Sequence, residues 1–383
     1  MFSKSKKVGI LGGGQLGKMV ALAAGNWHFP IKFLDKTAEF PTGRYAAEFV
    51  EGDFKNYDDV YNFGKDCDVI SIEIEHVNTD ALLQLKKEGK TIHPDPEKLL
   101  IIKDKGLQKQ FYQKHNLPTS PFQLFDNEEL IIESVMDGKL KLPFVQKTRG
   151  EGYDGKGVAV IKTEADFSKI LKGPSLVEEL VDIEKELAVI VAKNESGEIA
   201  SYPTVEMEFN PIANLVEFLL CPAQITEEQE KTCVDLARSV IEKMDVCGLL
   251  AVELFLTKKG EIIINEVAPR PHNSGHHTID SSFTSQFEQH IRAIMNLPLG
   301  STKNKIPSIM VNLLGADGYT GNAFYDGFEK CLEVEGVNLH LYGKEITKPF
   351  RKMGHATIVD KDLNAAREKA QFVKDQLIIR TDS

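Results

Sequence analysis

The stretch GLLAVELFLTKKGEIIINEVAP, residues 248–269, reads as two apolar strands joined by a turn centred between Lys259 and Gly260. In that register Glu253 on the first strand lies opposite Glu266 on the second. Their Cβ atoms would then be about 5 Å apart, where facing like charges destabilise a sheet. A divalent cation between the carboxylates would remove this repulsion, and Mg²⁺ prefers such hard oxygen ligands. The hairpin therefore predicts an antiparallel sheet that carries a magnesium site.

Two other interpretations of these glutamates are a slipped strand register and a pair of solvated surface side chains. Both strands are otherwise strongly apolar, so we expect them to be buried, where unpaired carboxylates are costly. Burial therefore favours the metal site over the alternatives. Asn265 adds a further oxygen beside Glu266.

The densest polar stretch of the chain follows the second strand. It consists of Arg270, Pro271, His272, Asn273, Ser274, Gly275, His276 and His277. An arginine and several hydrogen-bonding groups beside a metal suit an oxyanion such as bicarbonate or an acyl phosphate. A histidine-rich surface loop and a zinc site are the other interpretations, and zinc is disfavoured because no cysteine accompanies the histidines.

Near the N-terminus, KKVGILGGGQLGKMVALAAG at residues 6–25 reads as a strand, a glycine turn and a helix. Its loop, residues 12–17, satisfies G-x-G-x-x-G, and Asp35 ends the next strand, which together favour a dinucleotide site and a nicotinamide-dependent oxidoreductase. Backbone N–H groups at a helix start would equally attract a sugar phosphate. The glycines would also allow close strand–helix packing alone. The loop leaves these interpretations open, and Gln15 offers a polar side chain at its mouth.

Alternating strands and helices predict a parallel α/β domain over residues 1–104. A polar, helix-compatible connector at residues 101–115 leads to a smaller unit, residues 105–180. In this unit a glycine-rich turn joins two strands, and we expect the unit to act as a mobile cover. Residues 181–383 are expected to form a C-terminal α+β catalytic domain with an antiparallel sheet and a small terminal subdomain. The predicted fold class is therefore α/β with three domains.

Bulk composition narrows the function classes. The net charge of −11 and the lack of a lysine or arginine run disfavour a nucleic-acid partner. Five scattered cysteines without a CxxC pair support neither a disulfide framework nor structural zinc, and fit a reducing compartment. Glycines interrupt any signal-peptide core, and no apolar run is long enough to span a bilayer. We therefore expect a cytoplasmic protein with no membrane partner.

These stretches, with TRGEGYDGKG at residues 148–157, resemble the ATP-grasp superfamily. More narrowly they resemble the N5-carboxyaminoimidazole ribonucleotide synthetases of purine biosynthesis, and the similarity extends to YGKEITKPFRKMGHATI at residues 342–358. The resemblance implies a three-domain ATP-grasp ligase that couples ATP, bicarbonate and 5-aminoimidazole ribonucleotide, giving the N5-carboxylated product, ADP and phosphate. It also implies two Mg²⁺ ions at Glu253 and Glu266, and a homodimer.

Several residues match the ATP site of that family. Lys105 and Lys147 match lysines that contact the ATP phosphates as point charges, and Glu186 matches the acid that binds the ribose hydroxyls. Without the resemblance, each would be interpreted as a solvated surface charge. The remaining matches are the lid loop (Gly152, Tyr153, Asp154, Gly155, Lys156, Gly157 and Val158), the adenine hinge (Glu178, Glu179, Leu180 and Val181) and the pair Asn265 and Glu266.

The resemblance also implies a site for the ribonucleotide. Glu73 stands at the carboxyl end of a strand, where open α/β sheets place ligands, and is expected to accept a hydrogen bond from the aminoimidazole, with Glu75 the weaker candidate. The other matched residues are Gln15, Leu16, Tyr153, Asp154 and the phosphate-gripping pair Lys344 and Arg351. Bicarbonate or carboxyphosphate would be held by Arg270, His272, Asn273 and Ser274.

Two residues depart from the family pattern. Phe209 stands where a histidine is expected, and Lys105 replaces an arginine, which keeps the charge but loses the bidentate guanidinium. Three other functions remain open: another ATP-grasp ligase such as a formate-using purine transformylase, a nicotinamide-dependent oxidoreductase, and a non-catalytic nucleotide sensor.

Overall fold

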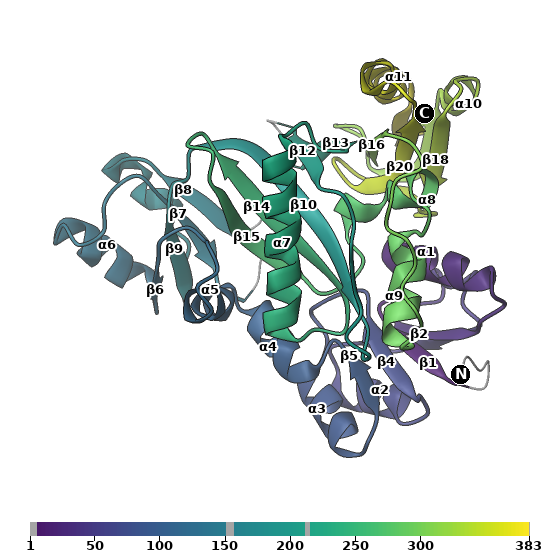
Figure 1. The fold of residues 1–383 in the computed structure, drawn as a ribbon, viewed down its shortest axis with the longest axis horizontal. Coiled ribbons are helices and arrows are strands. Elements are labelled where there is room, and N and C mark those ends of the chain that lie inside the picture. The colour runs from purple at the N-terminus through teal and green to yellow at the C-terminus, as the bar shows by residue number, and fades with distance from the viewer. Residues whose placement is uncertain (1–5, 151–156, 211–214, 383) are drawn as a thin grey trace.

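The computed structural model describes residues 6–150, 157–210 and 215–382. The chain forms an N-terminal α/β unit, a small lobe, and a central unit whose sheet continues into the C-terminal part (Figure 1). In that view the small lobe lies on the left, the N-terminal unit lies below the central sheet and extends to the lower right, and the C-terminal part lies at the upper right. No helix in the described part of the chain combines the length and apolar character that crossing a bilayer requires.

The N-terminal unit is the predicted parallel sheet, with strand order β3-β2-β1-β4-β5. Its elements are β1 (Val8–Leu11), α1 (Gln15–Gly25), β2 (Ile31–Asp35), β3 (Glu48–Glu51), α2 (Tyr57–Gly64), β4 (Val69–Ile72), α3 (Thr79–Lys87), β5 (Thr91–His93) and α4 (Pro96–Lys103). Successive strands are added on one side of β1 as far as β3, and then on its other side from β4 onward. Open α/β sheets bind ligands at such a switch point, here between β1 and β4. The glycine loop after β1 and Glu73 after β4 meet at this point.

The small lobe is an antiparallel sheet of order β6-β9-β7-β8. Its elements are β6 (Phe122–Phe125), α6 (Glu128–Met136), β7 (Phe144–Thr148), β8 (Val158–Ile161), the 3₁₀ turn η1 (Glu164–Lys169) and β9 (Ser175–Glu179). The strand pair predicted on either side of the glycine-rich turn is therefore confirmed as β7 and β8. Ile131, Phe144 and Val177 form part of a small separate core.

The central sheet has nine strands in the order β15-β14-β10-β12-β13-β16-β20-β18, with β11 paired to β10. Its strands are β10 (Ile183–Lys193), β11 (Ile199–Ser201), β12 (Val205–Phe209), β13 (Val216–Cys221), β14 (Gly248–Thr257), β15 (Ile262–Ala268), β16 (Ser308–Leu314), β18 (Val337–Leu341) and β20 (Lys352–Val359). Every pairing in it is antiparallel, as predicted for the hairpin.

Helices hold this sheet to its neighbours. The long helix α7 (Glu227–Met244) buries Leu236, Val240 and Ile241 against β10 and β14. On another face, α9 (Gln286–Ile294) shares a core with α1 and β1 and so joins the central and N-terminal units. The remaining elements are η2 (Asn273–Gly275), α8 (Thr278–Ser281), β17 (Gly321–Asp326), α10 (Phe328–Leu332), β19 (Ile346–Thr347), α11 (Leu363–Gln376) and β21 (Ile378–Thr381).

The predicted connector is more than a linker. It breaks at Asp104, whose carboxylate accepts hydrogen bonds from the backbone N–H groups of Gly106 and Leu107 and so caps α5 (Lys105–Lys114). The buried face of α5 includes polar side chains, among them Gln108 and Lys109. Buried polar groups need partners, and those of α5 lie at the candidate site.

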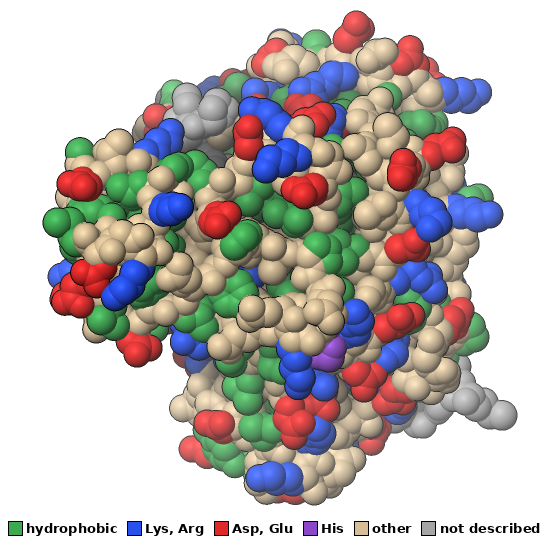
Figure 2. Space-filling view, turned by 60° about the vertical axis from the view of Figure 1, so that its left-hand side comes forward, with side chains coloured by type: hydrophobic (Ala, Val, Ile, Leu, Met, Phe, Trp, Pro, Cys, Tyr) green, Lys and Arg blue, Asp and Glu red, His purple; other side chains and the backbone are tan. Residues whose placement is uncertain are grey.

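The surface mixes charges of both signs. Figure 2 shows lysine and arginine side chains interspersed with aspartate and glutamate over one face of the molecule. This pattern is typical of a solvated protein surface, because neighbouring opposite charges limit any extended field of one sign.

Candidate active site

The glutamates of the 248–269 hairpin face each other as predicted. Glu253 pairs with Glu266, but the register shifts one residue nearer the turn, where Leu254 pairs with Ile264. The predicted register was therefore wrong at the turn, because a β-bulge inserts Asn265 as an extra residue. Such a bulge re-aims side chains. The Asn265 amide donates to a Glu253 carboxylate oxygen at 3.4 Å and accepts from Lys147 Nζ at 2.8 Å.

The surroundings of the two carboxylates shift their pKa values in opposite directions. The Glu253 and Glu266 side chains are 21% and 35% exposed. Burial, then the nearby Glu266 and Glu186 carboxylates, raise the pKa of Glu253 to about 8. Burial also raises the pKa of Glu186, on β10, to about 7. Burial alone would raise the pKa of Glu266 as well, but Lys105 and Lys147 hold it below its usual value.

This donor set fits a hard divalent cation. Two facing carboxylates are ligands that Mg²⁺ prefers, and its other ligands are usually water and substrate phosphates. The Asn265 amide oxygen, which accepts from Lys147 here, could serve only after giving up that contact. Among residues 6–150, 157–210 and 215–382, no group of three or more His, Cys, Asp or Glu side chains is placed to hold a metal.

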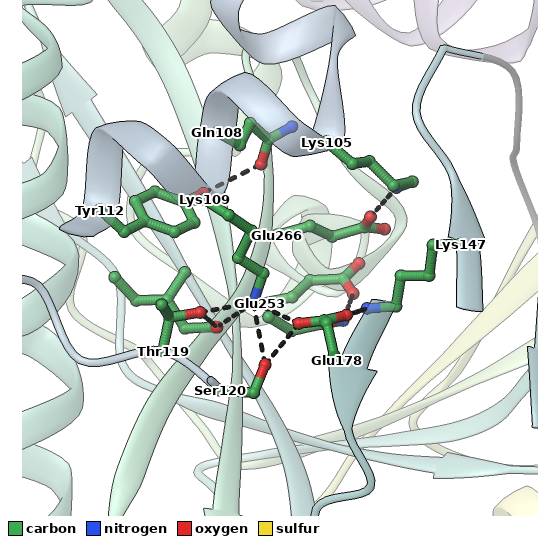
Figure 3. Close-up of polar contacts among 12 residues, drawn as sticks. Lys105, Gln108, Lys109, Tyr112, Thr119, Ser120, Lys147, Glu178, Glu253 and Glu266 are labelled. Carbon is green, nitrogen blue, oxygen red and sulfur yellow. Dashed lines mark hydrogen bonds and ion pairs between the residues drawn. The ribbon is translucent and has the colours of Figure 1, made fainter. Parts of the chain in front are cut away.

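Both lysines predicted to bind phosphate contact residues of this hairpin (Figure 3). Lys105, the first residue of α5, forms an ion pair with Glu266. Lys147, on β7 of the small lobe, lies 2.8 Å from Asn265 Oδ1 and 2.7 Å from Glu178 Oε2. Two cations from different elements are therefore brought together beside the facing glutamates.

The Glu178 side chain is a buried ion-pair partner, not the solvated surface charge that it would be without the family resemblance. Its side chain is buried, and its Oε1 lies 2.6 Å from the ammonium of Lys109 while Oε2 contacts Lys147. Burial would raise the pKa of Glu178, but Lys147 and Lys109 lower it to about 2. Glu178 is therefore a charged anchor for two lysines. Sequence reasoning missed Lys109, although it stands four residues after Lys105 and so on the same helix face.

The other described hinge and lid residues lie at the ends of strands of the small lobe and in the link to β10. Glu179 ends β9, and Leu180 and Val181 continue from it toward β10, with Leu180 partly exposed. Val158 begins β8 opposite Lys147, and Gly157 has a positive φ of 77° at the turn before it. Gly152, Tyr153, Asp154, Gly155 and Lys156 lie outside the described residues.

The polar stretch after β15 meets the carboxylates directly. His272 Nε2 lies 3.5 Å from Glu253 Oε1, and its Nδ1 lies 2.9 Å from Ser274 Oγ. Burial, then Arg270 and Lys352, lower the pKa of His272 to about 3, so the imidazole is neutral. Arg270 Nε contacts Glu75 Oε1 at 2.8 Å. The weaker substrate candidate, Glu75, is thus the counterion of Arg270.

Two of the predicted bicarbonate residues also have structural partners. The Asn273 side chain exchanges two hydrogen bonds with Asn312 on β16, at 2.9 and 3.1 Å. Backbone groups of His272 are held by Gln286 on α9, whose Oε1 accepts at 2.9 Å and whose Nε2 donates at 2.7 Å. His276 stands four residues after His272, a spacing found in zinc sites, but its ring packs against His355 and Phe287.

The glycine loop is not arranged as a phosphate cradle. The N–H of Gly13 donates to Asp35 at 2.7 Å, and those of Gly14 and Gly17 donate to Glu73 at 2.9 and 3.3 Å. Carboxylates of the chain itself therefore take the donors that a dinucleotide pyrophosphate would need. This arrangement disfavours the oxidoreductase interpretation. Burial raises the pKa of Glu73 to about 7.

The residues predicted to bind the ribonucleotide lie in two separate parts of the chain, at the start of α1 and between β18 and β20. Gln15 and Leu16 begin α1, but the Leu16 side chain is buried in the core, which leaves its backbone for ligand contact. Lys344 Nζ donates to the Lys352 carbonyl at 2.6 Å, and Arg351 donates to the Ile346 carbonyl. Both cations lie on the C-terminal segment between β18 and β20. Phe209, the departure from the family histidine, packs beside the core of β12 and β13.

Comparison with known proteins covers nearly the whole chain. A ribonucleotide synthetase preATP-grasp domain matches residues 5–103, an ATP-grasp domain matches 110–287, and a phosphoribosylaminoimidazole carboxylase C-terminal domain matches 308–369. An N5-carboxyaminoimidazole ribonucleotide synthase of Bacillus subtilis is 36% identical over 361 residues, which are 92% of this chain and 91% of that protein.

Further relatives and solved structures are also similar to this chain over nearly its whole length. A phosphoribosylaminoimidazole carboxylase of Ogataea methanolica is 36% identical over 97% of this chain, which spans 69% of that longer protein and 66% of the Candida glabrata one. The crystal structure of N5-carboxyaminoimidazole ribonucleotide synthetase from Thermotoga maritima is 46% identical, with a TM-score of 0.90 over 98% of this chain and all of that one. A synthase from Aspergillus clavatus, solved with ADP and 5-aminoimidazole ribonucleotide, is 31% identical with a TM-score of 0.88 over 97% of this chain and 98% of that one. The chain belongs to the N5-carboxyaminoimidazole ribonucleotide synthase family of ATP-grasp ligases.

Proposed function

We propose that this chain carboxylates 5-aminoimidazole ribonucleotide on its exocyclic amine, with bicarbonate as carbon source and ATP as energy source, in purine biosynthesis. The observation that carries the proposal is the contact between the two parts of the site. Glu253, opposite Glu266 in the hairpin, lies 3.5 Å from His272 in the polar stretch PRPHNSGH, residues 269–276. This contact supports the proposal, because the proposed ATP–cation site and the proposed oxyanion site would then be adjacent, as attack of bicarbonate on a phosphoryl group requires.

The cation and phosphate side of the mechanism uses the hairpin and two lysines. Glu253, Glu266 and Asn265 would hold Mg²⁺, which when bound neutralises charge on the ATP phosphates. Lys105 would exchange its contact with Glu266 for a phosphate oxygen, and Lys147 would keep Glu178 as anchor while its ammonium faces the γ-phosphate. Glu186 would accept hydrogen bonds from the ribose hydroxyls, and residues 178–181 would bind adenine.

Bicarbonate would be bound by neutral and cationic hydrogen-bonding side chains. Arg270 would pair with bicarbonate, and Ser274 would hydrogen-bond it. His272 would act as a neutral hydrogen-bonding group because its pKa is lowered to about 3. Attack by a bicarbonate oxygen on the γ-phosphorus breaks the bond to ADP and forms carboxyphosphate. The exocyclic amine then attacks the carboxyl carbon, or CO2 released from it, and phosphate and one proton leave.

The ribonucleotide would lie at the switch point of the N-terminal sheet. Glu73 would accept a hydrogen bond from the aminoimidazole, and Lys344 and Arg351 would bind the 5′-phosphate. Tyr153 and Asp154 of the lid loop, with Gln15 and the backbone of Leu16, complete the proposed contacts. Closure of the lid would protect the short-lived intermediate from water.

Assembly and compartment are also proposals. We propose a homodimer, which light scattering on the purified chain would test. A cytoplasmic location is supported by the five free cysteines, four of which are buried.

Phosphate release from ATP tests the proposed function in three mixtures: complete, without bicarbonate, and without 5-aminoimidazole ribonucleotide. The proposal predicts fast release only in the complete mixture. Equal release in all three would make the chain an uncoupled ATPase, and release restored by formate in place of bicarbonate would assign a transformylase.

A further inference from the structure

The outer edge of β15 has an unusual set of partners. β15 is the terminal strand of the central sheet, so its outward backbone groups have no neighbouring strand and need other partners. The segment before β6 supplies two of them. The Ile264 N–H donates to the Pro118 carbonyl at 2.8 Å, and the Ile264 carbonyl accepts from Thr119 Oγ1 at 2.8 Å.

Helix α5 supplies the others from buried polar side chains. Gln108 Oε1 accepts from the Val267 N–H at 3.2 Å, and Lys109 Nζ lies 3.4 Å from the Ile264 carbonyl. Gln108 and Lys109 are only 4% and 2% exposed. Figure 3 shows the Lys109 side chain extending from the helix toward Thr119, Ser120 and Glu178, whereas the Gln108 side chain lies level with the helix and contacts Tyr112. The strand is therefore bonded on each side of residues 265–266.

These contacts lie where the pairing of β15 with β14 is irregular. The bulge at Asn265 breaks the regular ladder with β14, and a slip of one residue moves a side chain to the other face of a sheet. Partners on the outer edge at Ile264 and Val267 bracket the bulge. In the register that carries these contacts, Asn265 meets Lys147 and Glu266 meets Lys105.

We propose that Gln108, Lys109 and Thr119, here called the edge clamp, are positioning residues for cation and ATP-phosphate binding. The clamp would act through the bulge, by holding Asn265 and Glu266 in place. The inference rests on the proposed function, because it takes those two residues as ligands of the cation–nucleotide complex.

Lys109 links the clamp to the phosphate lysines as well. Its ammonium contacts Glu178 Oε1 at 2.6 Å, the other oxygen of Glu178 holds Lys147, and Lys147 reaches Asn265. Lys105, one helical turn earlier on α5, contacts Glu266. A single helix thus sets the position of the strand and of the cations that face it.

Variants separate this role from general stability. Thr119→Val keeps the shape of the side chain and removes the hydroxyl that bonds Ile264, whereas Thr119→Ser keeps that hydroxyl. Lys109→Met removes the ammonium. Tyr112→Phe is the matched control, because the Tyr112 hydroxyl donates to Gln108 at 2.9 Å in the same buried network but does not bond β15.

The measurements are Mn²⁺ affinity in the presence of ADP, from electron paramagnetic resonance, the KM values for ATP and 5-aminoimidazole ribonucleotide, and amide exchange of residues 262–268. Loss of a group that orients a metal ligand costs about tenfold or more in affinity. Thr119→Val and Lys109→Met should therefore weaken Mn²⁺ binding and raise the KM for ATP about tenfold. The KM for the ribonucleotide should change less than about twofold, and residues 262–268 should exchange faster.

Thr119→Ser should restore the Mn²⁺ affinity, and Tyr112→Phe should lower thermal stability without changing that affinity. The clamp is overturned if Thr119→Val and Lys109→Met bind Mn²⁺ like the unmodified chain, or if Tyr112→Phe loses as much affinity as they do. An unmodified chain that binds no Mn²⁺ with ADP would instead overturn the proposed function, and the clamp with it.

Discussion

Glu253 and Glu266 face each other, yet they have unlike neighbours. Glu266 contacts the ammonium of Lys105, whereas Glu253 contacts Asn265 and the neutral His272. This asymmetry explains why the pKa of Glu253 is raised to about 8 while that of Glu266 is lowered. Replacement of either carboxylate by an amide would therefore remove a proposed cation ligand, but only replacement of Glu266 would also free a lysine from its ion pair.

Glu266→Gln tests the cation site most simply among single residues. We expect kcat/KM for ATP to fall by about a hundredfold or more, because a preorganised charge at the phosphates is lost. The control is Glu261→Gln, an exposed glutamate near the turn of the same hairpin, which should leave kcat/KM unchanged. Near-normal turnover of Glu266→Gln would remove Glu266 from the metal site.

Glu178 makes a prediction about acid stability. Its pKa is about 2 in the folded chain against an ordinary value of 4.5, so the folded state binds fewer protons between these values. This stabilisation is present above about pH 4.5 and is lost as the pH falls toward 2, with a magnitude on the order of 3 kcal/mol. Urea unfolding between pH 6 and 3 should show a shallower decline of the unfolding free energy for Glu178→Gln. A slope identical to that of the unmodified chain would contradict the charged anchor.

At the scale of elements, the loop between β1 and α1 depends on a close approach to Glu73. Gly12 has a φ of +105°, and a Cβ there would lie 2.6 Å from Glu73 Cγ. Gly12→Ala should lower the free energy of unfolding by about 2 kcal/mol or more, from strain and overpacking. Gly25→Ala, at the end of α1 with open space around it, should change it by less than about 1 kcal/mol. Equal effects in chemical denaturation would contradict this account.

The elements were predictable to different degrees. Alternating apolar runs identified the parallel unit and the β14–β15 hairpin, because burial imposes a local pattern on each strand. The bulge at Asn265 was not predictable, since it depends on the partners of β15 at Pro118, Thr119 and α5. The glycine loop satisfied a dinucleotide pattern, yet its N–H groups bond Glu73 and Asp35, which no local pattern reveals.

At the scale of the whole molecule, the site is assembled from distant parts of the chain. Lys105 and Glu266 are 161 residues apart, and Lys147 and Asn265 are 118 apart. Spacing along the sequence does not specify such contacts, so only the family resemblance suggested that these residues share a site. Lys109, which the resemblance did not include, was found only in the fold.

Ligand binding should stabilise the whole molecule, because the site joins separate units. ADP with Mg²⁺ at about a hundred times its Kd should add about 2.7 kcal/mol to the free energy of unfolding, seen as a higher thermal midpoint. Excess EDTA should remove most of this shift, since the phosphates would then face Glu253 and Glu266 without a cation. NAD should give no shift, and a rise with NAD alone would revive the oxidoreductase interpretation.

Transfer of an oxygen atom tests the central claim most directly, namely that the cation–phosphate site and the PRPHNSGH site together join bicarbonate to the γ-phosphate of ATP. The complete reaction is run with ¹⁸O-labelled bicarbonate, and the released phosphate is analysed by mass spectrometry. The account predicts one ¹⁸O atom in each phosphate, because the bicarbonate oxygen that attacks phosphorus stays on it when carboxyphosphate breaks down. Phosphate that carries no label, while carboxylated product accumulates, would contradict the account.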